Sequence, residues 1–256
     1  MKKSTNIITN ETIRRLLKDV KQIMKHPLTD NGIYYIHDDT DMTKGYAMII
    51  GQKGTIYHGG YYIFSFDFPF DYPFSPPKVT YMTNDGQTRF NPNLYPCGKV
   101  CVSILNTWSG EKWSSCQTIN SVLLTLCTLL NNEPLLNEPG QNSNSKDFIS
   151  YHKSIQYTNI DYAICYIIIH NKTYNHIYNL FYNIMKEQFI INFDELLTFV
   201  QSQSKEITLQ HVDIYNMNTY INYSELETKL IETKHFIETE TKTETETKTE
   251  TETNNI

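Results

Sequence analysis

Positive charge is not in excess in this chain, because 22 Lys and Arg residues stand against 28 Asp and Glu residues and give a formal net charge of −6. A general nucleic-acid binder that works by counterion release needs the opposite balance, so we expect no nucleic-acid partner. Long apolar runs are also missing: the longest, at about residues 163–169, is far shorter than the roughly 20 residues that a membrane helix needs. We therefore expect neither a membrane span nor a membrane partner.

A paired set of cysteines is absent as well. The five cysteines are an odd number, and the N-terminal residues MKKSTNIITNETIRR have a basic start without the apolar stretch of a secretory signal. Free thiols in a reducing, intracellular compartment fit this pattern, so we expect the protein in the cytoplasm, the nucleus or both. The cysteines are Cys97, Cys101, Cys116, Cys127 and Cys165.

Much of the acidity lies near the C-terminal end. Residues 238–253 read ETETKTETETKTETET and carry a net charge of −4, which leaves −2 for the rest of the 256 residues. The overall acidity therefore says little about the partners of the folded part. The repeat has a period of two but no apolar face, so it cannot hold a strand in a sheet. We predict that residues 206–256 are weakly structured to disordered.

An amphipathic helix is predicted over residues 10–25, because apolar side chains recur there at spacings of three and four. Thr9 or Asn10 can cap its start, and Pro27 follows its end. The apolar stripe consists of Ile13, Leu16, Leu17, Val20, Ile23 and Met24.

Four strands are predicted next, in runs rich in Tyr, Ile, Val and Phe. The connections between the first three are too short for crossover helices, so we expect an antiparallel meander. The segment PFDYPFSPP after the third run cannot be a central strand, because proline lacks the donor N–H and restrains the preceding residue. The runs lie at about residues 32–37, 45–50, 61–68 and 78–82.

A second long helix is predicted over residues 117–131, with a wide apolar stripe and Ser115 as its cap. We expect this helix to be the central one. Shorter helical patterns follow at about residues 146–156, 159–170, 174–188 and 194–204.

Cys101 follows Gly98-Lys99-Val100 and precedes an apolar run, and its local sequence leaves two interpretations open. It is either a small core residue, the commoner role of a free cysteine, or a nucleophile. A zinc site with Cys97 is disfavoured, because no second pair of Cys or His stands at ligand spacing. The histidines that Cys–His chemistry would need have no distinctive context. They are His26, His37, His58 and His152.

The order of these pieces resembles the ubiquitin-conjugating enzyme family. The matching motifs are YPFSPPKV at residues 72–79, Asn-Pro-Asn at residues 91–93 and Gly-Lys-Val-Cys at residues 98–101, followed by a tryptophan and the long apolar helix. The nearer resemblance is to the larger members, which carry an insertion after the cysteine and a helical C-terminal extension. The insertion here is residues 106–112.

The resemblance implies an α+β fold with an N-terminal helix, a four-stranded antiparallel meander, a central helix and a C-terminal helical extension. It divides the chain into a catalytic core at residues 9–160, an extension at residues 161–205 and the tail at residues 206–256. It also implies a transferase. Cys101 would accept ubiquitin or a ubiquitin-like protein as a thioester from an activating enzyme, which uses the ATP, and would pass it to lysines of protein substrates. No metal or organic cofactor is implied.

Three further residues gain catalytic roles from the resemblance. Attack on the thioester creates an oxyanion that needs a fixed donor, which the Asn93 amide matches; alternatively, Asn93 only hydrogen-bonds its own loop. The attacking lysine must be neutral although its free pKa is about 10.4, and a nearby acid assists. The family places acidic residues after the central helix, which points to Glu138 with its neighbour Asn137. Asn91 stands where the family has histidine, which implies a looser structural hydrogen bond.

Partner-binding residues follow in the same way. In the family, the aromatic residue of the proline loop, here Phe74, and the turn at Ser115 contact ring-type ubiquitin ligases, although the family's usual proline is missing at position 115. Phe74 could equally be a packing residue. The basic face of the first helix, with Arg14, Arg15 and Lys18, is the expected dock for the activating enzyme; the alternative is a solvated face.

Two alternatives to the transferase stand. One is a catalytically silent variant of a conjugating enzyme that acts as a ubiquitin-binding scaffold, although such variants usually lack the cysteine. The other is a structural α+β domain with a buried cysteine. The transferase requires the Cys101 sulfur to lie at the surface, in a shallow groove beside the Asn93 carboxamide.

Overall fold

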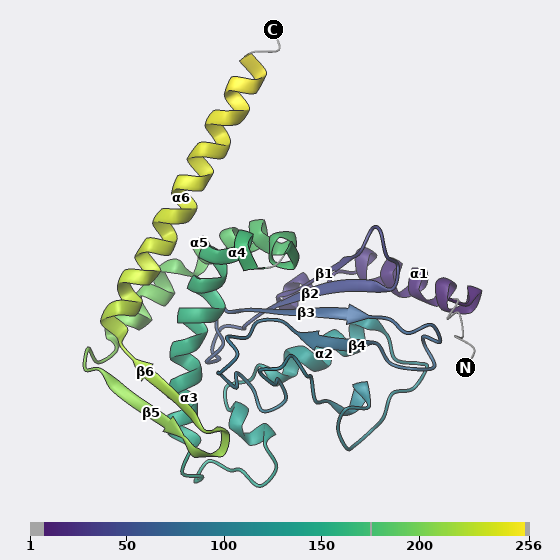
Figure 1. Ribbon diagram of the computed structural model, residues 1–256, viewed down its shortest axis with the longest axis horizontal. Coiled ribbons are helices and arrows are strands. Elements are labelled where there is room, and N and C mark those ends of the chain that lie inside the picture. The colour runs from purple at the N-terminus through teal and green to yellow at the C-terminus, as the bar shows by residue number, and fades with distance from the viewer. Residues whose placement is uncertain (1–7, 175, 254–256) are drawn as a thin grey trace, which may run out of the picture.

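The computed structural model describes residues 8–174 and 176–253, with side chains described for 8–170 and 176–242. Its sheet has four antiparallel strands that pair in chain order, so the predicted meander is confirmed (Figure 1). In the register, Ala47 faces Tyr35 on one side and Phe64 on the other. The strands are β1 (Ile33–His37), β2 (Lys44–Ile50), β3 (Tyr61–Asp67) and β4 (Lys78–Tyr81).

Two helices of the core confirm the predicted positions. Helix α1 (Asn10–Lys25) begins after Thr9, whose hydroxyl accepts the Thr12 N–H. Helix α2 (Ile119–Leu129) begins after Thr118, which forms a capping box with Ser121. The prediction of Ser115 as its cap is therefore wrong by three residues, because the reciprocal bonds of Thr118 and Ser121 set the first turn.

The helices that follow the core are divided at other residues than predicted. Helix α3 (Phe148–Thr158) passes into a π-helix (Asn159–Tyr166) and then α4 (Ile167–Tyr174). Helix α5 (His176–Ser202) replaces two predicted helices. The reason is visible in residues 189–193, where Phe189 and Phe193 are buried one turn apart and continue the buried face without a breaker.

Residues 206–256 differ most from the prediction. A hairpin of β5 (Thr208–Val212) and β6 (Met217–Ile221) lies along α3, and helix α6 (Tyr223–Thr253) follows it and runs away from the body (Figure 1). The weakly structured tail is thus wrong for this hairpin and for the first turns of α6. Leu226, Leu230 and Ile237 are buried at helical spacing and give α6 an apolar stripe. Residues 254–256 of the predicted tail lie outside the described residues.

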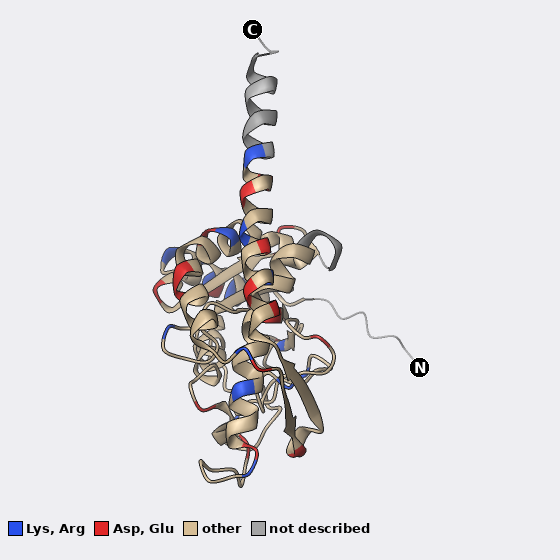
Figure 2. Ribbon diagram, turned by 90° about the vertical axis from the view of Figure 1, so that its left-hand side faces the viewer, with Lys and Arg blue, Asp and Glu red and all other residues tan. Residues whose placement is uncertain are grey.

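The charged residues are interspersed rather than gathered by sign on the face that Figure 2 shows. This distribution agrees with the nearly neutral net charge outside the Glu-Thr repeat. Among the helices of the described part of the chain, none is both long and apolar enough to span a bilayer.

Candidate active site

Asn93 and Cys101 face each other across two short chain segments. The Cys101 N–H donates to the carbonyl oxygen of Asn93 at 2.8 Å, and Asn93 Nδ2 donates to the carbonyl oxygen of Cys101 at 2.6 Å. The carboxamide therefore lies beside residue 101, as expected. A primary amide has two N–H donors, and this bond uses one. Asn93 does hydrogen-bond the backbone of its own site, while its role toward an oxyanion stays a prediction.

Cys101 is more enclosed than expected. The residue is only 2% exposed, so the expectation of a sulfur presented at the surface is wrong. Its chain neighbours Val100 and Val102 belong to the contiguous hydrophobic core. A surface groove of about 440 Å³ runs beside the segment and is lined by Val100 and Thr107, but not by Cys101. The cysteine is thus buried next to a groove and between two core residues.

The insertion at residues 106–112 folds back onto the chain that follows Cys101. Thr107 Oγ1 accepts the Val102 N–H and donates to the Val102 carbonyl oxygen, each at 3.0 Å. Gly110 lies so close to Ser103 that a Cβ atom there would come within 3.1 Å of the Ser103 Cβ. The insertion therefore holds the C-terminal side of the Cys101 segment in place.

Asn91 secures the loop that carries Asn93. It is fully buried, and its Nδ2 donates to the Leu129 carbonyl oxygen at 2.8 Å and to the Tyr57 hydroxyl at 3.3 Å. Its Oδ1 accepts the Asn93 N–H at 2.9 Å. The expected loosening at this position is wrong, because Asn91 bonds both the end of α2 and the Asn93 backbone.

Glu138 and Asn137 lie in the loop after α2, at the end of a 3₁₀ turn (Pro134–Asn137). Asn137 Nδ2 donates to the Leu129 carbonyl oxygen at 3.4 Å, so this loop and Asn91 share one acceptor. The Glu138 carboxylate accepts the Tyr215 hydroxyl at 2.8 Å. In the described part of the chain, no hydrogen bond joins Glu138 to Asn93 or Cys101. The catalytic roles of Glu138 and Asn137 stay predictions.

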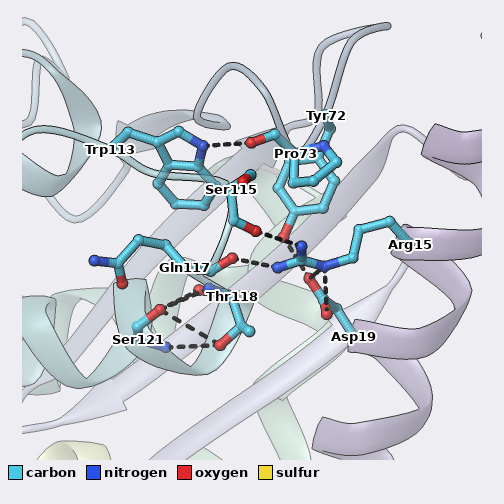
Figure 3. A network of polar contacts seen from close by, with 9 residues as sticks. All are labelled: Arg15, Asp19, Tyr72, Pro73, Trp113, Ser115, Gln117, Thr118 and Ser121. Atoms are coloured by element: carbon cyan, nitrogen blue, oxygen red, sulfur yellow. Dashed lines mark hydrogen bonds and ion pairs between the residues drawn. The ribbon is translucent and has the colours of Figure 1, made fainter.

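Arg15 is built into the fold, in contrast to the expected docking role. Its Nε donates to both carboxylate oxygens of Asp19 at 3.0 Å, and its Nη atoms donate to the carbonyl oxygens of Ser115 and Gln117 (Figure 3). The Tyr72 hydroxyl donates to the same carboxylate of Asp19, which is 3% exposed. Arg15 thus ties α1 to the chain before α2, and its guanidinium is committed within the molecule.

The other expected partner residues do lie at the surface. Phe74 is 64% exposed, and Ser115, Arg14 and Lys18 are also exposed. Trp113 Nε1 donates to the Pro73 carbonyl oxygen at 2.7 Å and so joins the loops that carry Phe74 and Ser115 (Figure 3). Their partner roles stay predictions.

Two apolar residues of α1 are exposed, like the basic residues Arg14 and Lys18 of the same helix. Leu17 and Met24, which the predicted stripe places in the core, are 54% and 67% exposed. The buried face of α1 is therefore narrower than the periodicity predicts, with Leu16 and Ile23 at its centre.

Comparison with known sequences agrees with this fold. Residues 15–160, more than half of the chain, match the family described as ubiquitin-conjugating enzyme. The chain therefore belongs to the ubiquitin-conjugating enzyme family, and the resemblance drawn from the motifs is confirmed together with the fold class.

Among its relatives are proteins named ubiquitin-conjugating enzyme E2 Z. That of Xenopus tropicalis is 39% identical over 160 residues, which cover 61% of this chain and 50% of the relative. That of Homo sapiens is 42% identical over 158 residues, which cover 60% of this chain and 44% of the relative. The chain thus aligns with about half the length of these curated relatives.

Proposed function

We propose that this protein is a transferase that carries ubiquitin, or a ubiquitin-like protein, as a thioester on Cys101. The Cys101 thiolate would attack the thioester carbonyl carbon on the activating enzyme, forming a new C–S bond while the activating enzyme's sulfur leaves as a thiolate. A neutral lysine amine of a protein substrate would then attack the same carbon. The C–S bond breaks, an amide forms, the amine loses a proton and the Cys101 thiol is restored.

The reciprocal bonding of Asn93 and Cys101 is the observation that carries this proposal, together with the family match over residues 15–160. Each attack converts a carbonyl oxygen into an oxyanion, which a preorganised neutral donor stabilises. The Asn93 carboxamide is held against residue 101 and has a second N–H for this purpose. Asn91 fixes the Asn93 backbone and so limits its movement.

Cys101 is buried in this structure, so its sulfur must become accessible before it can react. The insertion is exposed at residues 106–112, and the hydroxyl of Thr107 makes two hydrogen bonds with the Val102 backbone. Because hydrogen bonds at an exposed, only partly buried segment open readily in local fluctuations, release of Thr107 would free the segment beside the groove. We propose that this movement exposes Cys101 to the incoming thioester.

The acceptor lysine would approach from the side of the loop after α2. Glu138 supplies a carboxylate that can orient the ammonium group and accept its proton, and Asn137 lies beside it.

The exposed residues Arg14 and Lys18 suit the activating enzyme, while Phe74 and Ser115 suit a ring-type ligase. All five cysteines are free, which supports a reducing intracellular compartment such as the cytoplasm or the nucleus.

A thiol-sensitivity assay tests the proposal. The protein is incubated with activating enzyme, ATP and ubiquitin or a ubiquitin-like protein, and gels are run with and without a thiol. We expect a thiol-sensitive adduct that the Cys101→Ala variant lacks. The Cys97→Ala variant is the matched control, since Cys97 is exposed four residues away and should be dispensable.

A catalytically silent scaffold is the alternative that the same assay separates from the transferase. A scaffold would form no adduct with any activating enzyme and modifier pair tested, yet would bind ubiquitin or a conjugating enzyme. This result would overturn the transferase proposal.

A further inference from the structure

The turn between β5 and β6 is anchored beside the candidate active site. Asp147, which is 5% exposed at the start of α3, accepts the Asp213 N–H at 3.1 Å and the Ile214 N–H at 2.9 Å. Lys146 forms an ion pair with the Asp213 carboxylate. The backbone of this turn is therefore fixed from α3, and so is the residue that follows, Tyr215.

Tyr215 reaches two parts of the site at once. Its hydroxyl donates to the Glu138 carboxylate at 2.8 Å. The Arg89 guanidinium carbon lies 5.2 Å from the centre of the Tyr215 ring and 3.2 Å from the centre of the Tyr95 ring. Both distances are within the range of a cation–π interaction. Tyr151, which is fully buried, packs its ring 5.5 Å from that of Tyr215.

Arg89 connects this contact to the loop that carries Asn93. Its Nη2 donates to the Pro92 carbonyl oxygen at 2.6 Å, immediately before Asn93. Its own carbonyl oxygen accepts the Tyr151 hydroxyl at 2.7 Å. The guanidinium thus contacts two aromatic rings and bonds the backbone of the Asn-Pro-Asn motif.

We infer that Tyr215 is a positioning residue for the transfer step: its hydroxyl orients the Glu138 carboxylate, and its ring holds Arg89 against the loop of Asn93. The inference rests on the proposed transferase function and assigns part of the active-site support to the C-terminal hairpin. Tyr215 touches neither Cys101 nor the reacting atoms, so it acts through Glu138 and Arg89.

The physical basis of this inference is the rotamer freedom that the Glu138 side chain would have without a bonding partner. A glutamate side chain loses substantial rotamer entropy when it is fixed, and proton transfer requires a group within hydrogen-bond reach of the amine. In the part of the chain that the structure describes, Tyr215 is the one side chain bonded to the Glu138 carboxylate. Loss of the hydroxyl should therefore leave the carboxylate present but poorly oriented.

Two substitutions separate the hydroxyl from the ring. Tyr215→Phe removes the bond to Glu138 and keeps the contact with Arg89, whereas Tyr215→Leu removes both. Tyr220→Phe is the matched control, since Tyr220 lies in β6 of the same hairpin and is 70% exposed. The purified full-length variants are charged with ubiquitin, and single-turnover kinetics measure the rate of thioester formation and the rate of discharge to free lysine separately.

We expect Tyr215→Phe to charge at the wild-type rate and to discharge about tenfold more slowly, which corresponds to losing one hydrogen bond to a charged group. Tyr215→Leu should discharge more slowly still, and Tyr220→Phe should match the wild type. In a Glu138→Gln background, Tyr215→Phe should cause little further loss, because the two residues act as one unit.

Three results would overturn the inference. Discharge by Tyr215→Phe at the wild-type rate removes the positioning role while leaving the transferase intact. An equal fall in charging and discharge, with a lowered unfolding midpoint, shows a structural role only. Failure of the wild-type protein to charge at all overturns the transferase proposal and this inference with it.

Discussion

At the scale of the residue, we predict that access to Cys101 depends on Thr107. It bonds both backbone groups of Val102, and replacement by valine keeps the shape but removes the hydroxyl. We predict that Thr107→Val increases the rate at which iodoacetamide alkylates Cys101, measured by mass spectrometry of the folded protein. Cys97 and Cys116 are exposed and provide the internal control, since their rates should not change. An unchanged rate at Cys101 would show that the insertion does not control its access.

Asp19 is the residue on which the network around Arg15 depends. Its carboxylate is 3% exposed and accepts bonds from Arg15 and Tyr72. Removal of one partner of a buried pair leaves the other charge uncompensated, so Asp19→Ala should lower the free energy of unfolding by about 3 kcal/mol. Urea unfolding measures the change.

The control for this prediction is an exposed ion pair. Lys53 and Glu195 have side chains that are 74% and 47% exposed, so Lys53→Ala should cost no more than about 1 kcal/mol. Equal losses for Asp19→Ala and Lys53→Ala would contradict the structural role given to Arg15.

At the scale of the element, helix α2 should be held by its buried face. Leu126 is completely buried and Leu124, two residues away, is 41% exposed. We expect Leu126→Ala to lower the free energy of unfolding by about 3 kcal/mol through the cavity that it leaves, and Leu124→Ala by about 0.5 kcal/mol or less. Similar losses from both substitutions would contradict the observed orientation of α2.

The same helix shows how much of the fold the sequence predicts. The apolar stripe located α2 because its period is local, but the cap depended on the reciprocal bonds between Thr118 and Ser121, and Ser115 was an equally acceptable residue type. The pattern predicted two helices, at residues 174–188 and 194–204, where the structure has the single helix α5 through residues 189–193. These residues are helical because Phe189 and Phe193 pack in the core. Tertiary packing of this kind overrides local propensity.

The sequence identifies the residues of the candidate site that belong to the family's motifs, but not the other residues of the site. Cys101 and Asn93 stand at fixed spacing in a recognisable order, so both could be named. The low exposure of Cys101 could not be predicted, because burial follows from tertiary packing that no local pattern shows. Tyr215 lies outside the region that resembles the family, and no local pattern distinguishes it. The lone Arg89 in an irregular segment was the one available signal.

At the scale of the whole molecule, stability should depend on pH through three histidines. Burial lowers the pKa values of His37, His58 and His152 below the ordinary value. The unfolded state therefore binds more protons, and stability must fall as the pH drops through the ordinary histidine pKa of about 6.5. The pKa of the exposed His211 is raised by its hydrogen bond to Asn218 and opposes this trend.

Urea unfolding at pH 7.5 and pH 5.5 checks this prediction. The window lies above the pKa values of the paired carboxylates, so the histidines dominate it. We expect a lower unfolding midpoint at pH 5.5 and a smaller difference in His58→Gln, because both ring nitrogens of His58 are buried without a hydrogen-bond partner. Equal midpoints at the two pH values would contradict the prediction.

The central claim is that one particular sulfur atom carries the acyl group, and replacement of that atom by oxygen tests it most directly. When Cys101→Ser is incubated with activating enzyme, ATP and ubiquitin, we expect an adduct that resists thiols, is cleaved by hydroxide and maps by mass spectrometry to residue 101. If the wild-type protein forms a thiol-sensitive adduct that persists in Cys101→Ser and maps to another cysteine, the claim is contradicted.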